Sequence, residues 1–431
     1  FPGRVGSAQG RCVILVLVVA AARARLAPMA QSLRRGDSSS NLLVPPGRGL
    51  MSPPESARSG NDGPKRTHQE RMAIFRSAAF ATAAGIQVQG LHSGSNKGTR
   101  EDGTSRVASM SKSSMASVTG SRGIRTCHNF RAYYDLGKEV MPTAHRNMSV
   151  QFGRRTHDGT ECVVKIRHKP DCFKGRTDER DWRRSMSLLL NLPDTPGMCK
   201  LFDVLEDENG IYTVMERVVG VDLFEIQEHE GALDGCVVRE VLRQLLMTMS
   251  HMHAHNIIHK DLKLENIMVH ATMTSRPTAC VKVIDFDTVE EWSPHSAPAR
   301  DVVGTNQYIA PEAYSGKYSP LSDIFSLGVV AYRLMCGKFP FQNSIFDDKA
   351  GENFVGSSKM DQIQSKLKAA SVDFSHRSFA ASTSAKDLIQ KMLSSKEATR
   401  PTAMAALRHP WFLEVEAPTL SNPIPVGQTA E

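Results

Sequence analysis

The chain has 431 residues, of which 40% are hydrophobic and 23% charged, as in a globular protein that carries some disordered sequence. Its net charge of +8 is uneven: residues 1–126 hold 18 of the 53 Lys+Arg and 6 of the 45 Asp+Glu, and the remainder holds 35 and 39. The basic character therefore belongs to the N-terminal tract, and charge gives no reason to expect that the folded part binds nucleic acid.

The eight cysteines are scattered along the chain, with no closely spaced pair. This spacing argues against a zinc site and against the disulfide framework of a small secreted domain. We expect most of them to be small buried residues in a reducing compartment. The cysteines are Cys12, Cys127, Cys162, Cys172, Cys199, Cys236, Cys280 and Cys336.

The first residue is Phe1, so either the N-terminus is incomplete or translation starts further in, at Met29 or Met51. Residues 12–22 form an unbroken apolar run of 11 residues behind two arginines. This run is too short to span a bilayer, so no transmembrane anchor is expected. It has the length of a signal-peptide core, and residues 22–24 offer a small-residue cleavage pattern.

The sequence that follows the apolar run is rich in Ser, Gly, Arg and Pro and poor in aromatic residues, so it cannot bury enough surface to fold. We interpret residues 1–126 as a disordered basic extension. An organelle-targeting segment and translated leader sequence remain alternatives. The expected location is the cytoplasm, or an organelle if this segment is translated and acts as an address.

Ordered structure is expected to begin near residue 127. Residues 130–140, 148–152 and 161–166 have the composition of strands, and residues 156–159 predict a turn between the last two. The third strand carries Lys165, the only lysine of that strand.

Helical periodicity comes next. Residues 178–192 and 237–253 place apolar side chains at three- and four-residue steps, which predicts two amphipathic helices. Residues 211–215 between them predict a strand. Residues 207–210 have a superficial likeness to a calcium-binding loop but are better interpreted as a hairpin turn.

A short polar run interrupts the apolar residues between 258 and 268 and contains Asp261, Lys263 and Asn266. A carboxylate can orient an attacking hydroxyl, an ammonium can offset charge on a moving phosphoryl group, and an amide oxygen can ligate magnesium. A β-branched run further on predicts a strand that ends at Asp285, where a metal that bridges phosphates would be held.

These two segments resemble the catalytic loop and the metal-binding motif of eukaryotic protein kinases of the Ser/Thr type. Further kinase-like motifs follow in the family order at 304–312, 323–334 and 400–412, and the last resembles the end of the calcium/calmodulin-dependent kinase group. The resemblance implies that Asp323 braces the catalytic loop and that Arg400 pairs with Glu312.

The fold implied by the resemblance is α+β and bilobal. A small antiparallel-sheet lobe with one main helix is expected at 127–218, and a larger, mostly helical lobe at 219–413, with ATP between them. Residues 414–431 would form a short C-terminal tail.

The resemblance also implies roles for individual residues. Asp261 would orient the substrate hydroxyl, Lys263 would steady the γ-phosphoryl group, and Thr305 would hydrogen-bond to both, a mark against tyrosine specificity. The residues expected to bind ATP are Lys165, Val150, Val163, Met215, Glu216, Val218, Asp222, Glu265, Asn266, Met268 and Asp285. The expected Mg²⁺ ligands are Asn266 and Asp285.

The nucleotide-covering loop departs from the family pattern. Counting back from Val150 places Thr143, His145 and Met148 where kinases have glycines, and anchoring on Gly137 instead recovers only one glycine. Glycines let backbone amides approach phosphates closely, so side chains here should weaken or reshape the cover over the nucleotide.

A second departure concerns the partner of Lys165. The family glutamate on the first long helix aligns near Ser185, and the nearest acids are Glu179 and Asp181. Either one of these acids substitutes through a shifted helix, or the ion pair is missing. Asp287 replaces the glycine of the metal motif, where it would stiffen the activation segment or add a carboxylate near the metal.

A third departure is Lys260, which replaces the family arginine before the catalytic aspartate. Lysine is a weaker phosphate clamp than a bidentate guanidinium, so control by activation-loop phosphorylation is less favoured. Ser293, Ser296 and Thr305 remain candidate acceptors.

Two functional hypotheses follow. The first is an active Ser/Thr kinase acting on protein substrates, with Asp222 and Glu265 favouring arginine upstream of the acceptor. The second is a pseudokinase scaffold with weak or no transfer. In either case we expect a monomer that does not bind nucleic acid, with no calmodulin-binding tail after Phe412 and no EF-hand.

Overall fold

The computed structural model describes residues 121–141, 147–170, 172–272, 278–349 and 351–413. The sequence-based interpretations of the basic tract and its apolar run, of Thr143 and His145, and of the C-terminal tail lie outside these residues. No helix in the described ranges is long and apolar enough to cross a membrane. No disulfide joins the seven cysteines that the structure describes.

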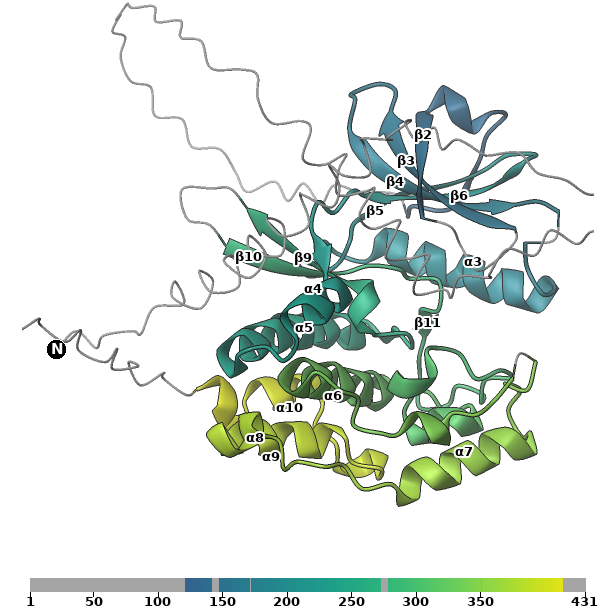
Figure 1. Ribbon diagram of the computed structural model, residues 1–431. Helices are drawn as coiled ribbons and strands as arrows, with labels where there is room; N and C mark the ends of the chain where they lie inside the picture. Colours follow the sequence, from purple (N-terminus) through teal and green to yellow (C-terminus); the bar gives the residue numbers. More distant parts are fainter. Residues whose placement is uncertain (1–120, 142–146, 171, 273–277, 350, 414–431) are drawn as a thin grey trace, which may run out of the picture.

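The N-terminal lobe is built on a six-stranded sheet with the strand order β1-β5-β6-β4-β3-β2 (Figure 1). Its strands are β1 (Arg125–Thr126), β2 (Tyr134–Met141), β3 (Met148–Arg155), β4 (Glu161–His168), β5 (Leu201–Glu206) and β6 (Gly210–Glu216). All neighbours pair antiparallel except β1 and β5. Along β4, Cys162, Val164 and Ile166 are buried on one face, which turns Lys165 to the other.

The start of this lobe differs from the prediction. The predicted strand at 130–140 begins only at Tyr134, because Phe130–Ala132 form the 3₁₀ helix η2. The side chain of Asn129 caps η2 by accepting a hydrogen bond from the Arg131 amide, and the Phe130 ring stacks on Tyr212 at 4.0 Å. Strand β1 precedes residue 127, so the sheet includes residues before the expected domain boundary.

Helix α3 (Arg176–Asn191) lies beside the sheet and matches the predicted helix at 178–192 closely (Figure 1). Trp182, Met186, Leu189 and Leu190 are buried in the main core. These residues follow the helical repeat, so the helix is held to the sheet by an apolar stripe.

The C-terminal lobe is mostly helical. Its helices are α4 (Leu223–Glu230), α5 (Gly235–Ala254), α6 (Pro320–Cys336), α7 (Ser358–Ala369), α8 (Arg377–Ala381), α9 (Thr383–Met392) and α10 (Ala403–Leu407). Short 3₁₀ helices are η3 (Leu264–Asn266), η4 (Asn306–Tyr308), η5 (Pro311–Ser315), η6 (Asn343–Ile345), η7 (Glu397–Thr399) and η8 (Pro410–Phe412).

Two small sheets lie at the upper side of this lobe, facing the N-terminal lobe (Figure 1). One has the order β10-β9-β7, with β7 (Val221–Asp222), β9 (Ile267–Thr272) and β10 (Thr278–Val283). The other pairs β8 (Ile257–Ile258) with β11 (Glu290–Glu291). The segments that carry the candidate site residues therefore converge where the lobes meet.

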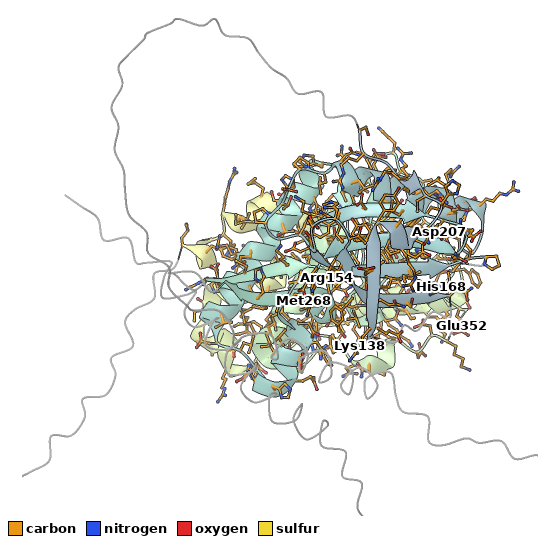
Figure 2. The ribbon with its side chains drawn as sticks, turned by 90° about the horizontal axis from the view of Figure 1, so that it is seen from above. Lys138, Arg154, His168, Asp207, Met268 and Glu352 are labelled. Atoms are coloured by element: carbon orange, nitrogen blue, oxygen red, sulfur yellow. The ribbon has the colours of Figure 1, made fainter. Side chains whose placement is uncertain are left out.

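The two-lobed α+β architecture that the resemblance implies is confirmed. Viewed from above, the sheet of the N-terminal lobe lies over the C-terminal lobe, with His168 and Asp207 at one end of the sheet (Figure 2). Asp207 accepts hydrogen bonds from the Asn209 and Gly210 amides, so residues 207–210 form the predicted hairpin turn between β5 and β6.

Candidate active site

Asp261, Lys263 and Thr305 form a closed triangle of hydrogen bonds. The Thr305 hydroxyl donates to Asp261 Oδ1 at 2.9 Å, and Lys263 Nζ donates to Thr305 Oγ1 at 2.9 Å and to Asp261 Oδ2 at 2.8 Å. The contacts expected of Thr305 are therefore present. The triangle joins the catalytic loop to a residue 44 positions further along the chain.

Buried Asp323, in the first turn of α6, holds the catalytic loop. Its carboxylate accepts hydrogen bonds from the His259 amide at 2.9 Å, the Lys260 amide at 3.0 Å and the His253 ring at 2.9 Å. Burial alone would raise the pKa of Asp323, but these partners hold it below its ordinary value. Lys260 has a φ of 69°, an uncommon backbone conformation for a residue other than glycine.

The Asn266 amide nitrogen donates to the Asp261 carbonyl at 2.9 Å, an orientation that leaves the amide oxygen for a ligand. Asp285 also has a positive φ, of 64°, and its carboxylate is 38% exposed. Loss of hydration would raise the pKa of Asp285, but the charge of Lys165 more than offsets this and holds the pKa below its ordinary value. The carboxylate is therefore charged at neutral pH.

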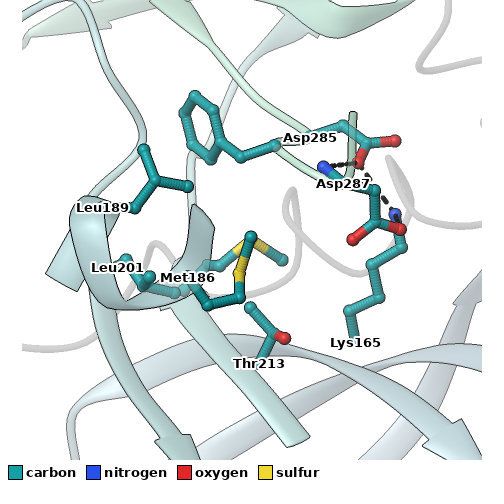
Figure 3. A pocket seen from close by; sticks show the side chains of 9 residues that line it. Lys165, Met186, Leu189, Leu201, Thr213, Asp285 and Asp287 are labelled. Atoms are coloured by element: carbon teal, nitrogen blue, oxygen red, sulfur yellow. Dashed lines mark hydrogen bonds and ion pairs between the residues drawn. The ribbon is translucent and has the colours of Figure 1, made fainter. Parts of the chain in front are cut away.

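Lys165 contacts two carboxylates from the segment after β10 (Figure 3). Its Nζ lies 2.8 Å from Asp285 Oδ1 and 2.6 Å from Asp287 Oδ2. Burial would lower the pKa of Lys165, but these carboxylates raise it above its ordinary value. The acids that pair with Lys165 are thus Asp285 and Asp287, and neither Glu179 nor Asp181 of α3 contacts it. The substitution by a shifted helix acid is wrong, and the family ion pair with α3 is missing.

The residues expected around the adenine ring come from four strands. In the register of the sheet, Val150 of β3 lies opposite Lys165, and Val163 of β4 lies opposite Met215 of β6. Met215 also lines the apolar pocket behind Lys165 (Figure 3). Val218 follows β6 and is half-buried.

Met268 enters from below, where β9 pairs with β7. In the register of these strands, Met268 lies opposite Asp222 of β7 and opposite Lys282 of β10. A contact between Met268 and adenine stays a prediction.

Two of the predicted acids have carboxylate partners that their sequence context did not reveal, and a third has a buried oxygen without one. Glu216 pairs with Lys282 Nζ at 2.5 Å, so its carboxylate is already occupied. Asp222 caps α4 by accepting a hydrogen bond from the Glu225 amide at 2.9 Å. By contrast, Glu265 Oε2 is buried and has no hydrogen-bond partner within the described residues.

Lys260, which replaces the family's phosphate-binding arginine, forms an ion pair with a carboxylate of the protein itself. Its Nζ lies 2.5 Å from Glu290 Oε2, and its side chain is only 9% exposed and packs near the Tyr318 ring. The neighbouring Glu291 pairs with Arg184 of α3. These two acids of β11 thus link the activation segment to the catalytic loop and to α3.

Sequence reasoning did not identify Arg167 or Glu290 as site residues. It also did not predict that Asp287 contacts Lys165. Arg167 NH2 lies 3.1 Å from Asp287 Oδ2. A signal for Arg167 was available, because residues two apart on a strand share a face and Lys165 was already assigned to the cleft. No comparable signal pointed to Glu290.

The donor set suits magnesium. Asn266 and Asp285 offer an amide and a carboxylate oxygen, the ligand types that Mg²⁺ prefers. No group of three or more His, Cys, Asp or Glu suited to a metal occurs in the residues that the structure describes. A metal here would therefore complete its coordination with water and substrate phosphates, as Mg²⁺ commonly does.

Comparisons with known proteins agree with this geometry. The family model described as protein kinase domain matches residues 147–412. "Calcium-dependent protein kinase 4" of Plasmodium falciparum is 32% identical over 61% of the chain and 46% of its own length. "Calcium-dependent protein kinase 17" and "Calcium-dependent protein kinase 34" of Arabidopsis thaliana are 30% and 32% identical over 67% of the chain and 51% and 52% of their own lengths. The chain thus spans about half the length of these relatives.

Proposed function

Because the chain belongs to the protein kinase family, we propose that it is an active Ser/Thr protein kinase. It would transfer the γ-phosphoryl group of Mg-ATP to hydroxyl groups of protein substrates. The observation that carries the proposal is the triangle of Asp261, Lys263 and Thr305, because it places a carboxylate and an ammonium at one point of the cleft.

In this mechanism Asp261 accepts a hydrogen bond from the substrate hydroxyl and orients its oxygen toward the phosphoryl group. Thr305 fixes one carboxylate oxygen, which leaves the other to share between Lys263 and the substrate. Lys263 offsets negative charge on the phosphoryl oxygens as the bond to the leaving group lengthens. The substrate proton passes to Asp261.

Lys165 would hold the α- and β-phosphates, and Asn266 and Asp285 would hold the magnesium ion. Magnesium supplies positive charge to the phosphate oxygens and so stabilises the charge that develops in transfer. Lys165 Nζ lies 2.8 Å from Asp285 Oδ1, so the lysine and the magnesium held by Asp285 would act on neighbouring phosphate oxygens.

Glu265 supports a preference for arginine upstream of the acceptor. Glu265 lies on η3 next to Asn266, and a substrate guanidinium that reached its carboxylate would form a charge-assisted pair with it. Glu265→Gln should therefore lower kcat/KM for a peptide with upstream arginine by about tenfold, and leave the same peptide with alanine there unchanged. An equal loss on both peptides would count against this preference.

A pseudokinase scaffold is the second candidate. It is favoured by the lack of an α3 acid at Lys165, because loss of that ion pair commonly impairs transfer. On this hypothesis the chain binds nucleotide or partners without catalysing transfer at a useful rate.

Two measurements on the same samples separate the candidates. Thermal shift with ATP and Mg²⁺ reports binding, and radiolabel transfer to basic peptides reports catalysis. Asp261→Asn should retain the thermal shift and lose transfer, whereas the exposed control Asp361→Asn should retain both. Nucleotide binding without Asp261-dependent transfer in the wild type would favour the scaffold.

The proposal assigns catalysis to the lobes at 127–218 and 219–413 and not to the flanking segments. Protein substrates are the partners it requires. A monomeric state, a cytoplasmic location, and the lack of nucleic-acid binding, a calmodulin-binding tail and an EF-hand stay predictions.

A further inference from the structure

Helix α3 offers Lys165 no counter-ion. At the position where the family has a glutamate, Ser185 is buried and its hydroxyl donates back to the Asp181 carbonyl at 3.1 Å. The carboxylates of Glu179 and Asp181 both pair with arginines of their own helix. A lysine whose side chain is only 14% exposed still requires a negative charge nearby, because burial of an unpaired ammonium is strongly unfavourable.

Asp287 supplies that charge from the activation segment. Its Oδ2 lies 2.6 Å from Lys165 Nζ, closer than the Asp285 carboxylate at 2.8 Å (Figure 3). The Asp287 side chain is 20% exposed, so water screens this contact only partly. The family has glycine here, but position 287 does not have a positive φ, so the backbone accepts a side chain without strain.

Arg167 orients Asp287 from the same strand as Lys165. Its NH2 lies 3.1 Å from the same Oδ2, and its guanidinium lies over the rings of Phe173 and Trp182, at 5.1 and 5.0 Å from their centroids. Stacking of this kind fixes a guanidinium in place. Trp182 belongs to α3, so the helix contributes an aromatic support where the family contributes an acid.

The cluster is balanced in charge. Two cations, Lys165 and Arg167, meet two carboxylates, Asp285 and Asp287, at the floor of the cleft. If Asp287 were absent, Lys165 would depend on Asp285 alone, and that carboxylate is also the one required by the metal. Asp287 therefore frees Asp285 for its role with the metal.

We propose that Asp287, held by Arg167, is the positioning residue that aligns Lys165 for the nucleotide phosphates in place of a glutamate on α3. This inference rests on the proposed kinase function. It means that the alignment of Lys165 depends on the same short segment that carries Asp285, two residues away, and not on a carboxylate from α3.

The first test is kinetic. Asp287→Asn keeps the shape of the side chain and removes its charge. It should raise KM for ATP and lower kcat/KM for ATP by roughly 10- to 100-fold. This is the size expected for the loss of one charge-assisted contact. KM for the peptide should stay within twofold. The matched control Asp181→Asn, an exposed acid of α3, should change neither value. Wild-type KM for ATP in Asp287→Asn, or an equal defect in Asp181→Asn, would overturn the proposal.

The second test needs no nucleotide. Thermal unfolding midpoints of Asp287→Asn, Arg167→Gln and the double variant form a double-mutant cycle on the full chain. The proposal requires the double variant to be less destabilised than the sum of the single variants, by at least about 2 °C. Additive shifts would overturn it. If Asp287→Asn does not fold, Arg167→Gln tested against ATP provides the same kinetic comparison with a smaller expected effect.

The two tests also separate this inference from the proposed function. A wild type that transfers no phosphate but shows coupling in the cycle would overturn the kinase function and leave the ion cluster in place. A wild type that transfers phosphate while Asp287→Asn is indistinguishable from it would overturn the role of Asp287 alone.

Discussion

Thr305→Val tests the geometry of the catalytic triangle. Valine keeps the shape of threonine but removes the hydroxyl that donates to Asp261 at 2.9 Å and accepts from Lys263 at 2.9 Å. A hydrogen bond to a charged group contributes about 1.5–3 kcal/mol. Asp261 and Lys263 retain their direct contact of 2.8 Å and can recruit water. We therefore expect the variant to lose about 1.4–2.7 kcal/mol of transition-state stabilisation. This corresponds to a fall in kcat of about 10- to 100-fold.

The assay is the initial rate of peptide phosphorylation at saturating Mg-ATP, with Thr305→Ser as the matched variant. Serine retains the hydroxyl, so its kcat should stay within about fivefold of the wild type. The unfolding midpoints of both variants are measured beside the rates, so that a loss of folded protein is distinguished from a loss of turnover. A valine variant as active as the serine variant would refute the idea that this hydroxyl positions Asp261.

Three further predictions concern stability and the activation segment. Arg400→Met should lower the free energy of unfolding by about 3–5 kcal/mol, because it removes the guanidinium that lies 2.6 Å from the Glu312 carboxylate. Urea unfolding would measure this loss, and a change below about 1 kcal/mol would contradict the prediction. Arg183 and other cations lower the pKa of Glu206 from 4.5 to about 2, so this carboxylate stabilises the fold above pH 4.5 and the stabilisation is lost as the pH falls toward 2. The gap in unfolding midpoint between wild type and Glu206→Gln should therefore close over that range, and a gap that is independent of pH would be inconsistent with it. Glu290→Gln should lower kcat about three- to tenfold without any change in phosphorylation state, because it unpairs the buried Lys260 next to Asp261, the proposed catalytic residue. Unchanged kcat would argue against this link.

The central site could be predicted because local spacing fixes it. Asp261, Lys263 and Asn266 lie close together in one tight loop, so their short spacing brings the side chains together once Asp323 holds the loop backbone. Thr305 and Asp285 were identified from the motifs around them. In the structure Thr305 donates to Asp261 of that loop, and Asp285 follows Ile284, whose amide donates to the Asn266 carbonyl. The pair of Arg400 and Glu312 was found in the same way and is present.

The ion-pair partners in the site could not be predicted, because the sequence shows which residues are charged but not which of them lie close together in the fold. The sequence showed that Lys165 lacked its usual glutamate, but Asp287 lies 122 positions away and competed with nearer acids on α3. Only the three-dimensional arrangement, with Arg167 supported by an aromatic pair, selects it. The carboxylates of Glu216 and Asp222 also have partners that the sequence did not reveal, Lys282 and the Glu225 amide, and the roles of both residues at the nucleotide stay predictions.

The strand predicted at 130–140 is present from Tyr134 onward, and its first residues differ for a local reason. Phe130 and Tyr134 are both suited to strands, but the side-chain cap from Asn129 competes with strand pairing. Stacking on Tyr212 then keeps Phe130 buried without placing it in the sheet. Pattern reasoning weighs residue types and does not detect such caps.

The most direct test of the account is the rate of γ-phosphoryl transfer from Mg-ATP to serine- and threonine-containing peptides by the wild-type chain and by Asp261→Asn. The account predicts measurable transfer by the wild type and a fall of at least about 100-fold in the variant, with the ATP-induced thermal shift retained in both. Transfer that persists in Asp261→Asn, or a wild type that binds Mg-ATP and transfers nothing, would contradict it.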